Sequence, residues 1–260
     1  MYHSISTKFS PRYRLFNVTP DEFLIQMRFL VDSGYATVSV TQLVETLRNN
    51  ASSLPARLAV LTFDDGFLDF YINAWPVLTQ LRLNATLYVV TNYIGRTGLW
   101  LDREGESDRP MLHWSHIREI DVSGIEVGAH SHTHPELDVI PVSVATREIS
   151  RCKAVLEDGL GKSVESFAYP YGYYSAAVRS IVKAAGYRSA CAVRYQASST
   201  NDDLFALSRL IVKPDLNLDE FHKLLCNTEP VFPPELRRTL AWGWRLIRLC
   251  NHLGQDLIIK

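Results

Sequence analysis

The chain has 260 residues, of which 47% are hydrophobic and 21% charged, and its formal net charge is −1. This composition is typical of a globular protein, and the near-zero charge excludes the basic balance that favours bulk binding of nucleic acid. No run of about 18 apolar residues occurs, so no membrane-spanning helix is predicted. The N-terminal residues lack a basic segment followed by an apolar one, and no cysteines form a Cys-x-x-Cys pair. We therefore expect no signal peptide, reduced thiols and a cytoplasmic location.

Strand and helix patterns alternate along the first ninety or so residues. The segment 1–5 is short and starts abruptly, which suggests a strand that begins at the first residue. Thr19, Pro20 and Glu22 form a capping-box pattern with proline in the first turn, which predicts a helix that ends at Gly34. The alternation continues with a strand at 36–40, a helix at 41–48, a strand at 58–63, a helix around 74–78 and a strand at 85–90.

Residues 91–110 interrupt this alternation, because they are largely polar, rich in glycine and aspartate, and lack periodicity. We expect a long loop there, over the mouth of a site. The pattern then resumes with a helix at 114–120, a strand at 124–129, a helix at 142–160, a strand at 166–169, a helix at 176–185, strands at 189–193 and 207–212, and a helix at 219–225. Such alternation predicts an α/β fold in which a parallel sheet forms a closed or nearly closed barrel.

An acidic pair follows one of these strands directly. The mostly apolar run 58–63 leads into Asp64, Asp65 and Gly66. A strand buried on both faces is typical of a parallel sheet, and its carboxyl end is where α/β enzymes hold their reactive groups. Because adjacent carboxylates repel each other, a cation or a proton relay would stabilise the pair. The alternative is an ordinary Asp-Gly turn.

A histidine cluster follows the strand at 124–129. His130, His132 and His134 lie within five residues, and neutral imidazole is a ligand of zinc and other borderline metals. On a helical turn His130 and His134 would share a face, whereas in an extended chain all three would, so the spacing leaves His132 ambiguous. Two histidines and one carboxylate with open positions form the pattern of a catalytic zinc site. The other carboxylate would then be free to take a proton from a metal-activated water.

These residues resemble the motifs of a known family. Thr-Phe-Asp-Asp-Gly at 62–66 and His-Ser-x-x-His at 130–134 resemble the first two motifs of the polysaccharide deacetylases, which are chitooligosaccharide deacetylase-like, metal-dependent carbohydrate N-deacetylases. The segment 167–172 resembles their third motif, and the resemblance covers roughly residues 1–225. It implies a distorted (β/α) barrel of about seven parallel strands. We therefore expect a catalytic domain over 1–228 and a C-terminal helical tail over 229–260.

The resemblance also implies roles for individual residues. Asp64 would be the catalytic base, and the backbone N–H of Tyr171 would help to hold the oxyanion. The ligands of a divalent metal, zinc in the first place and cobalt or nickel as alternatives, would be Asp65, His130 and His134. The positions expected to contact substrate are His3 and Pro170.

The chain departs from the family pattern in three places. The third motif commonly carries an arginine that orients the base, where this chain has Ala168. Arg209 either supplies that charge from a neighbouring strand end or is a plain surface arginine. The late Leu-x-His motif that supplies the general acid is not visible, because His222 fits a helix face. The aspartate motif that tunes this acid is also unclear, and residues 202–203 fit a turn better.

The sequence therefore leaves the identity of the general acid open. His3 is one candidate, because Tyr2-His3 resembles the start of some exopolysaccharide deacetylases, and His132 is the other. Either could instead bind substrate or pack in the core. His113 and His116 flank Trp114 on a predicted helix, and we interpret both as structural.

The favoured function is hydrolysis of the acetamide of an N-acetylated carbohydrate, with no nucleic-acid partner. A deformylase or deacylase of another small or lipid-linked amide would use the same residues. A non-haem iron oxygenase shares the ligand set, but such enzymes usually have antiparallel barrels. A glycan-binding degenerate member would have no need of a free base beside the metal. The tail carries apolar residues interleaved with arginines, which suits a helix packed on the barrel or, less simply, a basic helix at a membrane surface.

Overall fold

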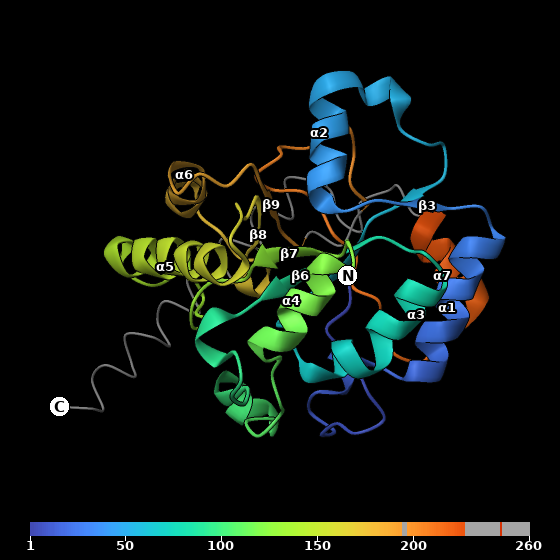
Figure 1. Ribbon diagram of the computed structural model, residues 1–260, viewed down its shortest axis with the longest axis horizontal. Coiled ribbons are helices and arrows are strands. Elements are labelled where there is room, and N and C mark those ends of the chain that lie inside the picture. Colours follow the sequence, from blue (N-terminus) through green and yellow to red (C-terminus); the bar gives the residue numbers. More distant parts are fainter. Residues whose placement is uncertain (194–196, 227–244, 246–260) are drawn as a thin grey trace.

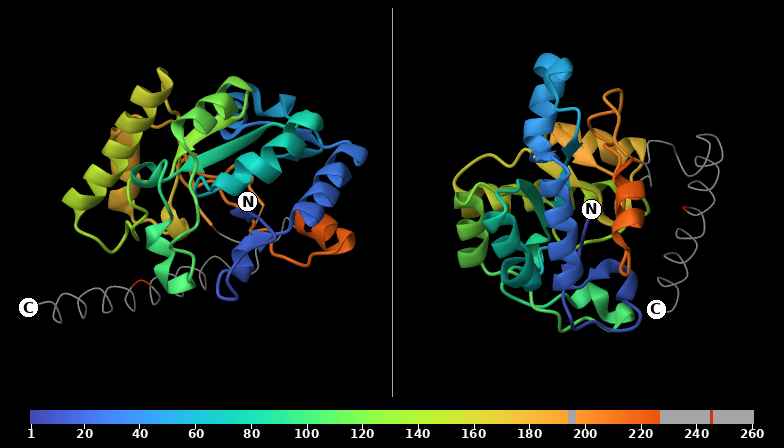
Figure 2. Two further views of the ribbon diagram at one scale, coloured as in Figure 1. Left: turned by 60° about the horizontal axis from the view of Figure 1, so that its bottom comes forward. Right: turned by 90° about the vertical axis from the view of Figure 1, so that its right-hand side faces the viewer.

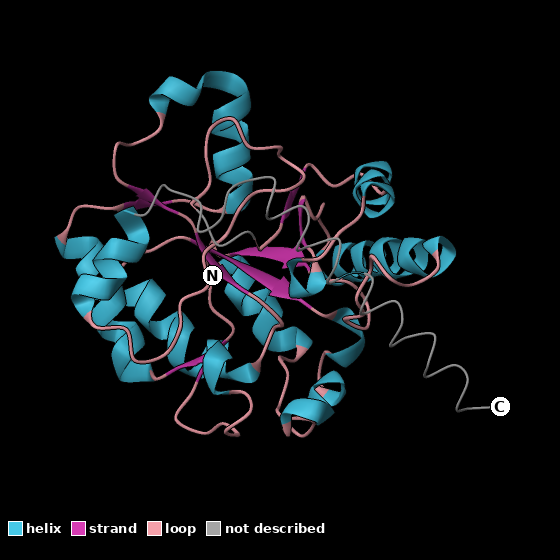
Figure 3. Cartoon of the chain, turned by 180° about the vertical axis from the view of Figure 1, so that it is seen from behind, coloured by secondary structure: helices cyan, strands magenta, loops and turns pink. Residues whose placement is uncertain are grey.

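A five-stranded parallel sheet lies at the centre of the computed structural model, which describes residues 1–193, 197–226 and 245 (Figures 1 and 3). Its strands, in spatial order, are β5 (Leu61–Phe63), β6 (Ala85–Val89), β7 (Glu126–Ala129), β8 (Ser166–Ala168) and β9 (Ser189–Cys191). Two parallel pairs accompany it: β1 (Ser4–Ile5) with β2 (Asn17–Val18), and β3 (Ala36–Thr37) with β4 (Leu58–Ala59).

Helices surround this sheet, as Figure 2 shows from two further sides. They are α1 (Pro20–Asp32), α2 (Val40–Asn50), α3 (Trp75–Gln80), α4 (Trp114–Val122), α5 (Val142–Leu160), α6 (Ala176–Ala184) and α7 (Leu218–Cys226). A π-helical turn, Phe70–Ala74, precedes α3. None of the helices in the described residues is long and apolar enough to cross a membrane.

Two further segments extend the sheet toward a closed barrel. Beyond β9, the backbone N–H of Ala192 donates to the Leu207 carbonyl at 2.8 Å, and the N–H of Val212 donates to the Met1 carbonyl at 3.0 Å. On the other side of residues 1–2, the Tyr2 N–H donates at 2.8 Å to the carbonyl of Thr62 in β5. Residues 207–212 and 1–2 therefore connect the two edges of the sheet, which agrees with the predicted barrel.

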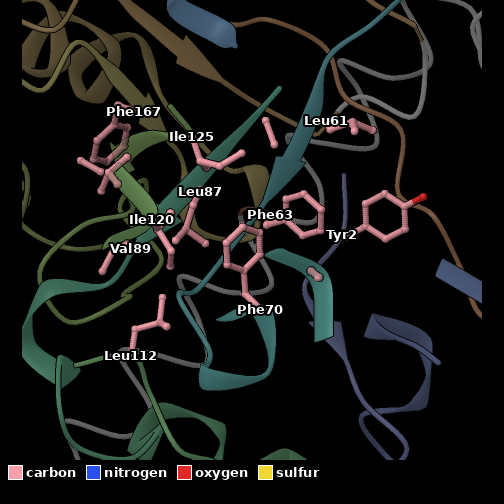
Figure 4. Close-up of a cluster of buried hydrophobic side chains, with 14 of the residues drawn as sticks. Tyr2, Leu61, Phe63, Phe70, Leu87, Val89, Leu112, Ile120, Ile125 and Phe167 are labelled. Carbon is pink, nitrogen blue, oxygen red and sulfur yellow. The ribbon is translucent and has the colours of Figure 1, made fainter. Parts of the chain in front are cut away.

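The core fills the space between the sheet and its helices. Phe63 and Leu87, on neighbouring strands, are fully buried, and the Phe63 ring packs on Phe70 and Tyr2 (Figure 4). Apolar side chains from α4 and α5 cover the sheet further along. Because these strands are short and buried, their ends are fixed, and so are the residues that follow them.

The structure corrects several element boundaries. The predicted strand 36–40 ends at Thr37, because the Ser39 hydroxyl accepts the Gln42 N–H and starts α2 one residue earlier than expected. The predicted strand 58–63 is divided between β4 and β5, which belong to different sheets. Residues 207–212 form one bridge, at Leu207, rather than a strand. The expected loop 91–110 contains two 3-10 helices, Thr91–Tyr93 and Leu99–Glu104. The predicted tail 229–260 lies outside the described residues, except for Arg245.

Candidate active site

The predicted site residues meet at one edge of the sheet. Asp64 and Asp65 follow the carboxyl end of β5, and His130 and His134 follow that of β7. Tyr171 lies in a 3-10 turn, Pro170–Gly172, just after β8. Because parallel strands present their carboxyl ends to the same edge, residues far apart in the chain are brought together here.

Asp65, His130 and His134 form a compact cluster. Their nearest ligand atoms all lie within 4.8 Å of one another, and all three side chains are buried. Asp65 Oδ1 lies 3.3 Å from His134 Nε2 and 3.5 Å from His130 Nε2. Asp65 has a φ of 76° and His134 a φ of 64°, a left-handed conformation that costs free energy for residues with a side chain.

The cluster fits a divalent metal ion. In the described part of the chain, Asp65 Oδ1 is buried without a hydrogen-bond partner. Burial, and then the charge of Asp64, raise the pKa of Asp65 well above its usual range. Burial lowers the pKa of both His130 and His134, which keeps the imidazoles neutral and able to bind a metal. His130 Nδ1 is 2.8 Å from the Ala168 carbonyl, to which it donates, so its Nε2 keeps a lone pair.

Asp64 occupies a different environment from its neighbour. Arg209 Nη1 lies 2.6 Å from Asp64 Oδ1, and Nη2 lies 2.8 Å from Oδ2, so the guanidinium donates to both carboxylate oxygens. Burial alone would raise the pKa of Asp64, but the charge and hydrogen bonds of Arg209 outweigh it and lower this pKa. Arg209 is buried as well, and is therefore not a surface arginine.

The two candidate acids lie in different places. His3 follows Tyr2, whose carbonyl accepts the Asp64 N–H at 3.0 Å. Burial lowers the pKa of His3 to about 4, so this side chain is uncharged at neutral pH. His132 lies outside the Asp65 cluster, and its Nδ1 is 2.8 Å from Thr91 Oγ1. The structure therefore separates His132 from the two histidines that its spacing could not distinguish.

Aromatic rings border the histidines. The Tyr171 ring lies 4.7 Å from the His134 ring, and the Trp100 ring lies 5.2 Å from it. Tyr171 is 48% exposed, and Tyr173 stacks on it with a centroid separation of 6.1 Å. Tyr174 stacks on the buried Tyr169 instead. Pro170 is buried at the start of the same turn, and holds the chain before Tyr171.

Sequence reasoning missed a buried charge network beside the site. Arg109 binds Asp69 at 2.8 Å and Glu106 at 2.9 Å, and donates to the Ser4 hydroxyl at 2.8 Å. Ser10 in the N-terminal loop also bonds to Glu106 and to the Glu104 carbonyl. Figure 2 shows the N-terminal loop and the segment of the Leu99–Glu104 helix side by side. Glu106 and Arg109 are three residues apart, but no local spacing links them to Ser4, Ser10 or Asp69, so only the fold reveals the network.

Comparison with known proteins decides the family. A model of the polysaccharide deacetylase family matches residues 51–190. The chain belongs to the polysaccharide deacetylase family. Two relatives are YxkH of Bacillus subtilis strain 168, whose name places it in this family, and a poly-β-1,6-N-acetyl-D-glucosamine N-deacetylase of Staphylococcus aureus. The first is 27% identical over 222 residues, which are 85% of this chain and 73% of YxkH. The second is 21% identical over 215 residues, which are 79% of this chain and 71% of the relative.

Solved structures agree with this assignment. The Streptococcus pyogenes deacetylase PplD, in complex with acetate, is 29% identical with a TM-score of 0.74, and the match covers 88% of this chain and 96% of PplD. IcaB from Ammonifex degensii shares the fold at 23% identity, with a TM-score of 0.71 and coverage of 86% and 93%. These matches confirm the predicted distorted (β/α) barrel. They also confirm the predicted enzyme class, that of the carbohydrate N-deacetylases.

Proposed function

We propose that this polysaccharide deacetylase uses a divalent metal, with zinc favoured over cobalt or nickel, to remove an acetyl group from an N-acetylated sugar. The substrate would be a poly- or oligosaccharide or a glycoconjugate. One observation carries the proposal, which is that the two adjacent aspartates have different partners. Asp65 clusters with His130 and His134, whereas Asp64 forms an ion pair with Arg209. This division provides a metal site and a separate ionised base. The name of the S. aureus relative, a poly-β-1,6-N-acetyl-D-glucosamine N-deacetylase, supports an N-acetylglucosamine polymer as the substrate class.

The metal would be held by Asp65, His130 and His134, and when bound it would lower the pKa of a water molecule and polarise the acetyl carbonyl. Asp64 accepts a proton from the attacking water, because Arg209 keeps its carboxylate ionised. The backbone N–H of Tyr171 donates a hydrogen bond to the carbonyl oxygen as negative charge develops there. The C–N bond then breaks, acetate leaves, and the amine of the sugar takes up a proton.

The proton for the amine can come from Asp64. An aspartate with a lowered pKa, once protonated, is a strong acid and gives up its proton readily.

His3 is uncharged at neutral pH, so in this proposal it contacts substrate through a hydrogen bond rather than storing a proton. Pro170 contributes to the same side of the site by fixing the turn that carries the Tyr171 N–H. The exposed ring of Tyr171 offers a face on which a sugar ring can pack.

Acetate release from a panel of N-acetylated glycans tests this proposal. The dialysed protein is assayed with added zinc, cobalt or nickel, and with the Asp64→Asn variant as the control. We expect metal-dependent release of acetate from at least one N-acetylglucosamine polymer, and release at least about 100-fold slower from the variant. Release that does not depend on metal would overturn the metal role.

The same panel separates the alternatives. N-formyl and longer N-acyl sugars detect a deformylase or deacylase, and lipid-linked N-acetyl sugars detect a membrane-derived substrate. Calorimetric binding of glycans without any acetate release would favour a glycan-binding protein. Oxygen consumption with iron would indicate the oxygenase, which the parallel barrel disfavours.

A further inference from the structure

The loop at residues 130–134 carries both histidines of the cluster, and it is fastened to the end of β6. The backbone N–H of His130 donates to the Val89 carbonyl at 3.1 Å. Two residues further along, the N–H of Asn92 donates to the His132 carbonyl at 2.8 Å. These bonds fix the first half of the loop relative to the sheet, but they do not hold His134.

The second half of the loop is fastened to α5 through one carboxylate. Glu148 Oε2 accepts the backbone N–H groups of His132 at 2.9 Å and Thr133 at 2.7 Å. Its other oxygen, Oε1, accepts the Thr133 hydroxyl at 2.9 Å. Hydrogen bonds to an ionised acceptor are stronger than those between neutral groups. Glu148 therefore holds the two residues that directly precede His134.

This part of the loop needs to be held because its backbone is strained. Ser131 has a φ of 63° and His134 a φ of 64°, both in the left-handed region that residues with a side chain avoid. The Ser131 hydroxyl accepts the His134 N–H at 3.0 Å, which is a bond within the loop itself. Without the Glu148 carboxylate, residues 133–134 would lose their anchor to α5, and the left-handed backbone at His134 would be free to relax and turn its ring away from Asp65.

We propose that Glu148 is a positioning residue that sets the metal affinity of the site by holding His134 in place. The inference rests on the proposed function, because it takes His134 as a metal ligand. Within the described residues, Glu148 makes no hydrogen bond or ion pair with Asp65, His130 or His134, and it acts through residues 132–133. Loss of such outer partners typically weakens metal binding by about 10- to 100-fold.

Zinc affinity, measured by competition with a chelator, tests this role. The Glu148→Ala protein is compared with wild type, and we expect its Kd for zinc to rise by about 10- to 100-fold. Acetate release at saturating zinc should recover to within a few-fold of wild type, because bound metal holds His134 in place once it is there. Glu148→Gln keeps an acceptor oxygen without the charge, so its Kd should lie between those of the other two proteins.

Glu157→Ala is a matched control on the same helix. Glu157 is also a partly buried carboxylate of α5, and it accepts the Val164 N–H at 3.0 Å and pairs with Lys153 at 2.9 Å, away from the histidines. Its removal should lower the melting temperature without changing the Kd for zinc. If Glu148→Ala does not fold, Thr133→Val removes only the hydroxyl contact and should raise the Kd by roughly 2- to 10-fold.

The outcomes distinguish this inference from the proposed function. If wild type binds no zinc, and His134→Ala behaves identically, the metal site itself is wrong. If wild type binds zinc and both Glu148→Ala and Thr133→Val bind it with an unchanged Kd, the positioning role is wrong and the metal site stands.

Discussion

Asp64 and Asp65 are adjacent in the chain, but their carboxylates face different partners. Both residues follow the end of β5, and the positive φ of Asp65 (76°) turns the chain sharply between their side chains and those that come next. The Asp64 carboxylate binds the Arg209 guanidinium at 2.6 Å and lies 3.8 Å from His130 Nε2. The Asp65 carboxylate lies nearer the histidines, 3.5 Å from His130 Nε2 and 3.3 Å from His134 Nε2. The separation lets one strand end supply two chemically distinct acids, one ionised and one in need of a cation.

The first prediction concerns the proposed base. Asp64→Asn keeps the shape of the side chain but cannot accept a proton, so kcat should fall by about 10²- to 10⁴-fold. Bound zinc, measured by atomic absorption after dialysis, should stay at the wild-type level. Near wild-type turnover would show that the roles of the two aspartates are wrongly assigned.

A second prediction concerns the ligands. Asp65→Ala, His130→Ala and His134→Ala should each lose zinc on dialysis, because each removes one of three protein ligands. His132→Ala is the control from the same loop, and it should keep its zinc because the His132 ring bonds to Thr91 instead. A fully loaded His134→Ala protein would contradict the ligand set.

Arg209 allows a prediction about pH. Removing its guanidinium should raise the pKa of Asp64, because the charge that outweighs burial is lost. The protonated form, which cannot act as a base, then persists to higher pH. The acidic limb of the pH–rate profile of Arg209→Ala should therefore move to higher pH, and kcat should fall by roughly 10- to 100-fold, as for other outer partners.

Arg209→Lys provides the comparison, and should restore part of the activity because lysine cannot donate to both carboxylate oxygens in parallel. Zinc content should be the same in all three proteins. An Arg209→Ala enzyme whose kcat and acidic limb match those of wild type would show that Arg209 does not orient Asp64.

Among the local elements, the turn after β8 is tightly constrained by its backbone and by its neighbours. Tyr171 and Gly172 have consecutive positive φ values of 58° and 75°. A Cβ at Gly172 would lie only 2.5 Å from the Cβ of Val193, so no other residue fits without moving the backbone. This turn fixes the Tyr171 N–H that we propose for the oxyanion, and the same geometry brings its ring against His134.

Gly172→Ala should therefore be destabilising and should lower kcat. The left-handed conformation alone costs about 1–2 kcal/mol for alanine, and the collision with Val193 adds to it. Gly34→Ala is the matched control, because Gly34 has a similar φ of 72° but, apart from its chain neighbours, no atom of the described residues lies within 4 Å of an added Cβ. Thermal unfolding should show a smaller loss for Gly34→Ala, with unchanged kcat. Equal losses of stability in the two variants would exclude the collision.

Elements with local signals were predictable, and those that depend on distant partners were less so. The Thr19–Glu22 capping box and the Gly161 end of α5 follow from neighbouring residues, and both occur as expected. The end of the strand at Thr37 could not be predicted from the residues of the strand itself, because the Ser39 side chain caps α2 and starts the helix there.

The site shows the same division. The motifs place Asp64, Asp65, His130 and His134 at strand ends, and the structure brings them together. Two interpretations of Arg209 were open, because it lies 145 positions after Asp64 and no spacing signal links residues so far apart. The contacts of Glu148 were missed entirely, since its partners are backbone groups and no residue type marks them.

At the scale of the whole molecule, barrel closure depends on short segments. Residues 207–212 and 1–2 each contribute few backbone bonds, yet they join β9 to β5. α7 packs on α1 beside them, with the Phe221 ring 6.0 Å from that of Phe29. The described barrel is therefore assembled from residues up to Cys226.

Removal of residues 229–260 should leave a folded core with a somewhat lower melting temperature, because Arg245 of the tail donates to the carbonyl of buried Asp138 at 3.0 and 3.1 Å. The truncated and full-length proteins are then compared by flotation with liposomes of anionic lipid. Flotation of the full chain alone would support a peripheral membrane role for the tail, and no difference would dismiss it. Aggregation of the truncated protein would show that the tail is needed to cover the barrel.

The guanidinium that faces Asp64 belongs to residue 209, whereas the resemblance leads one to look for it at the position of Ala168. A survey that judges catalytic activity from each sequence motif separately would record the third-motif arginine as missing. It would therefore group this chain with inactive relatives. What the carboxylate requires is a planar cation at the right distance, and a barrel offers several strand ends from which one can reach it. Chains with a gap in the third motif should therefore be sorted by what lies opposite the first aspartate in space, not by which column of an alignment holds an arginine.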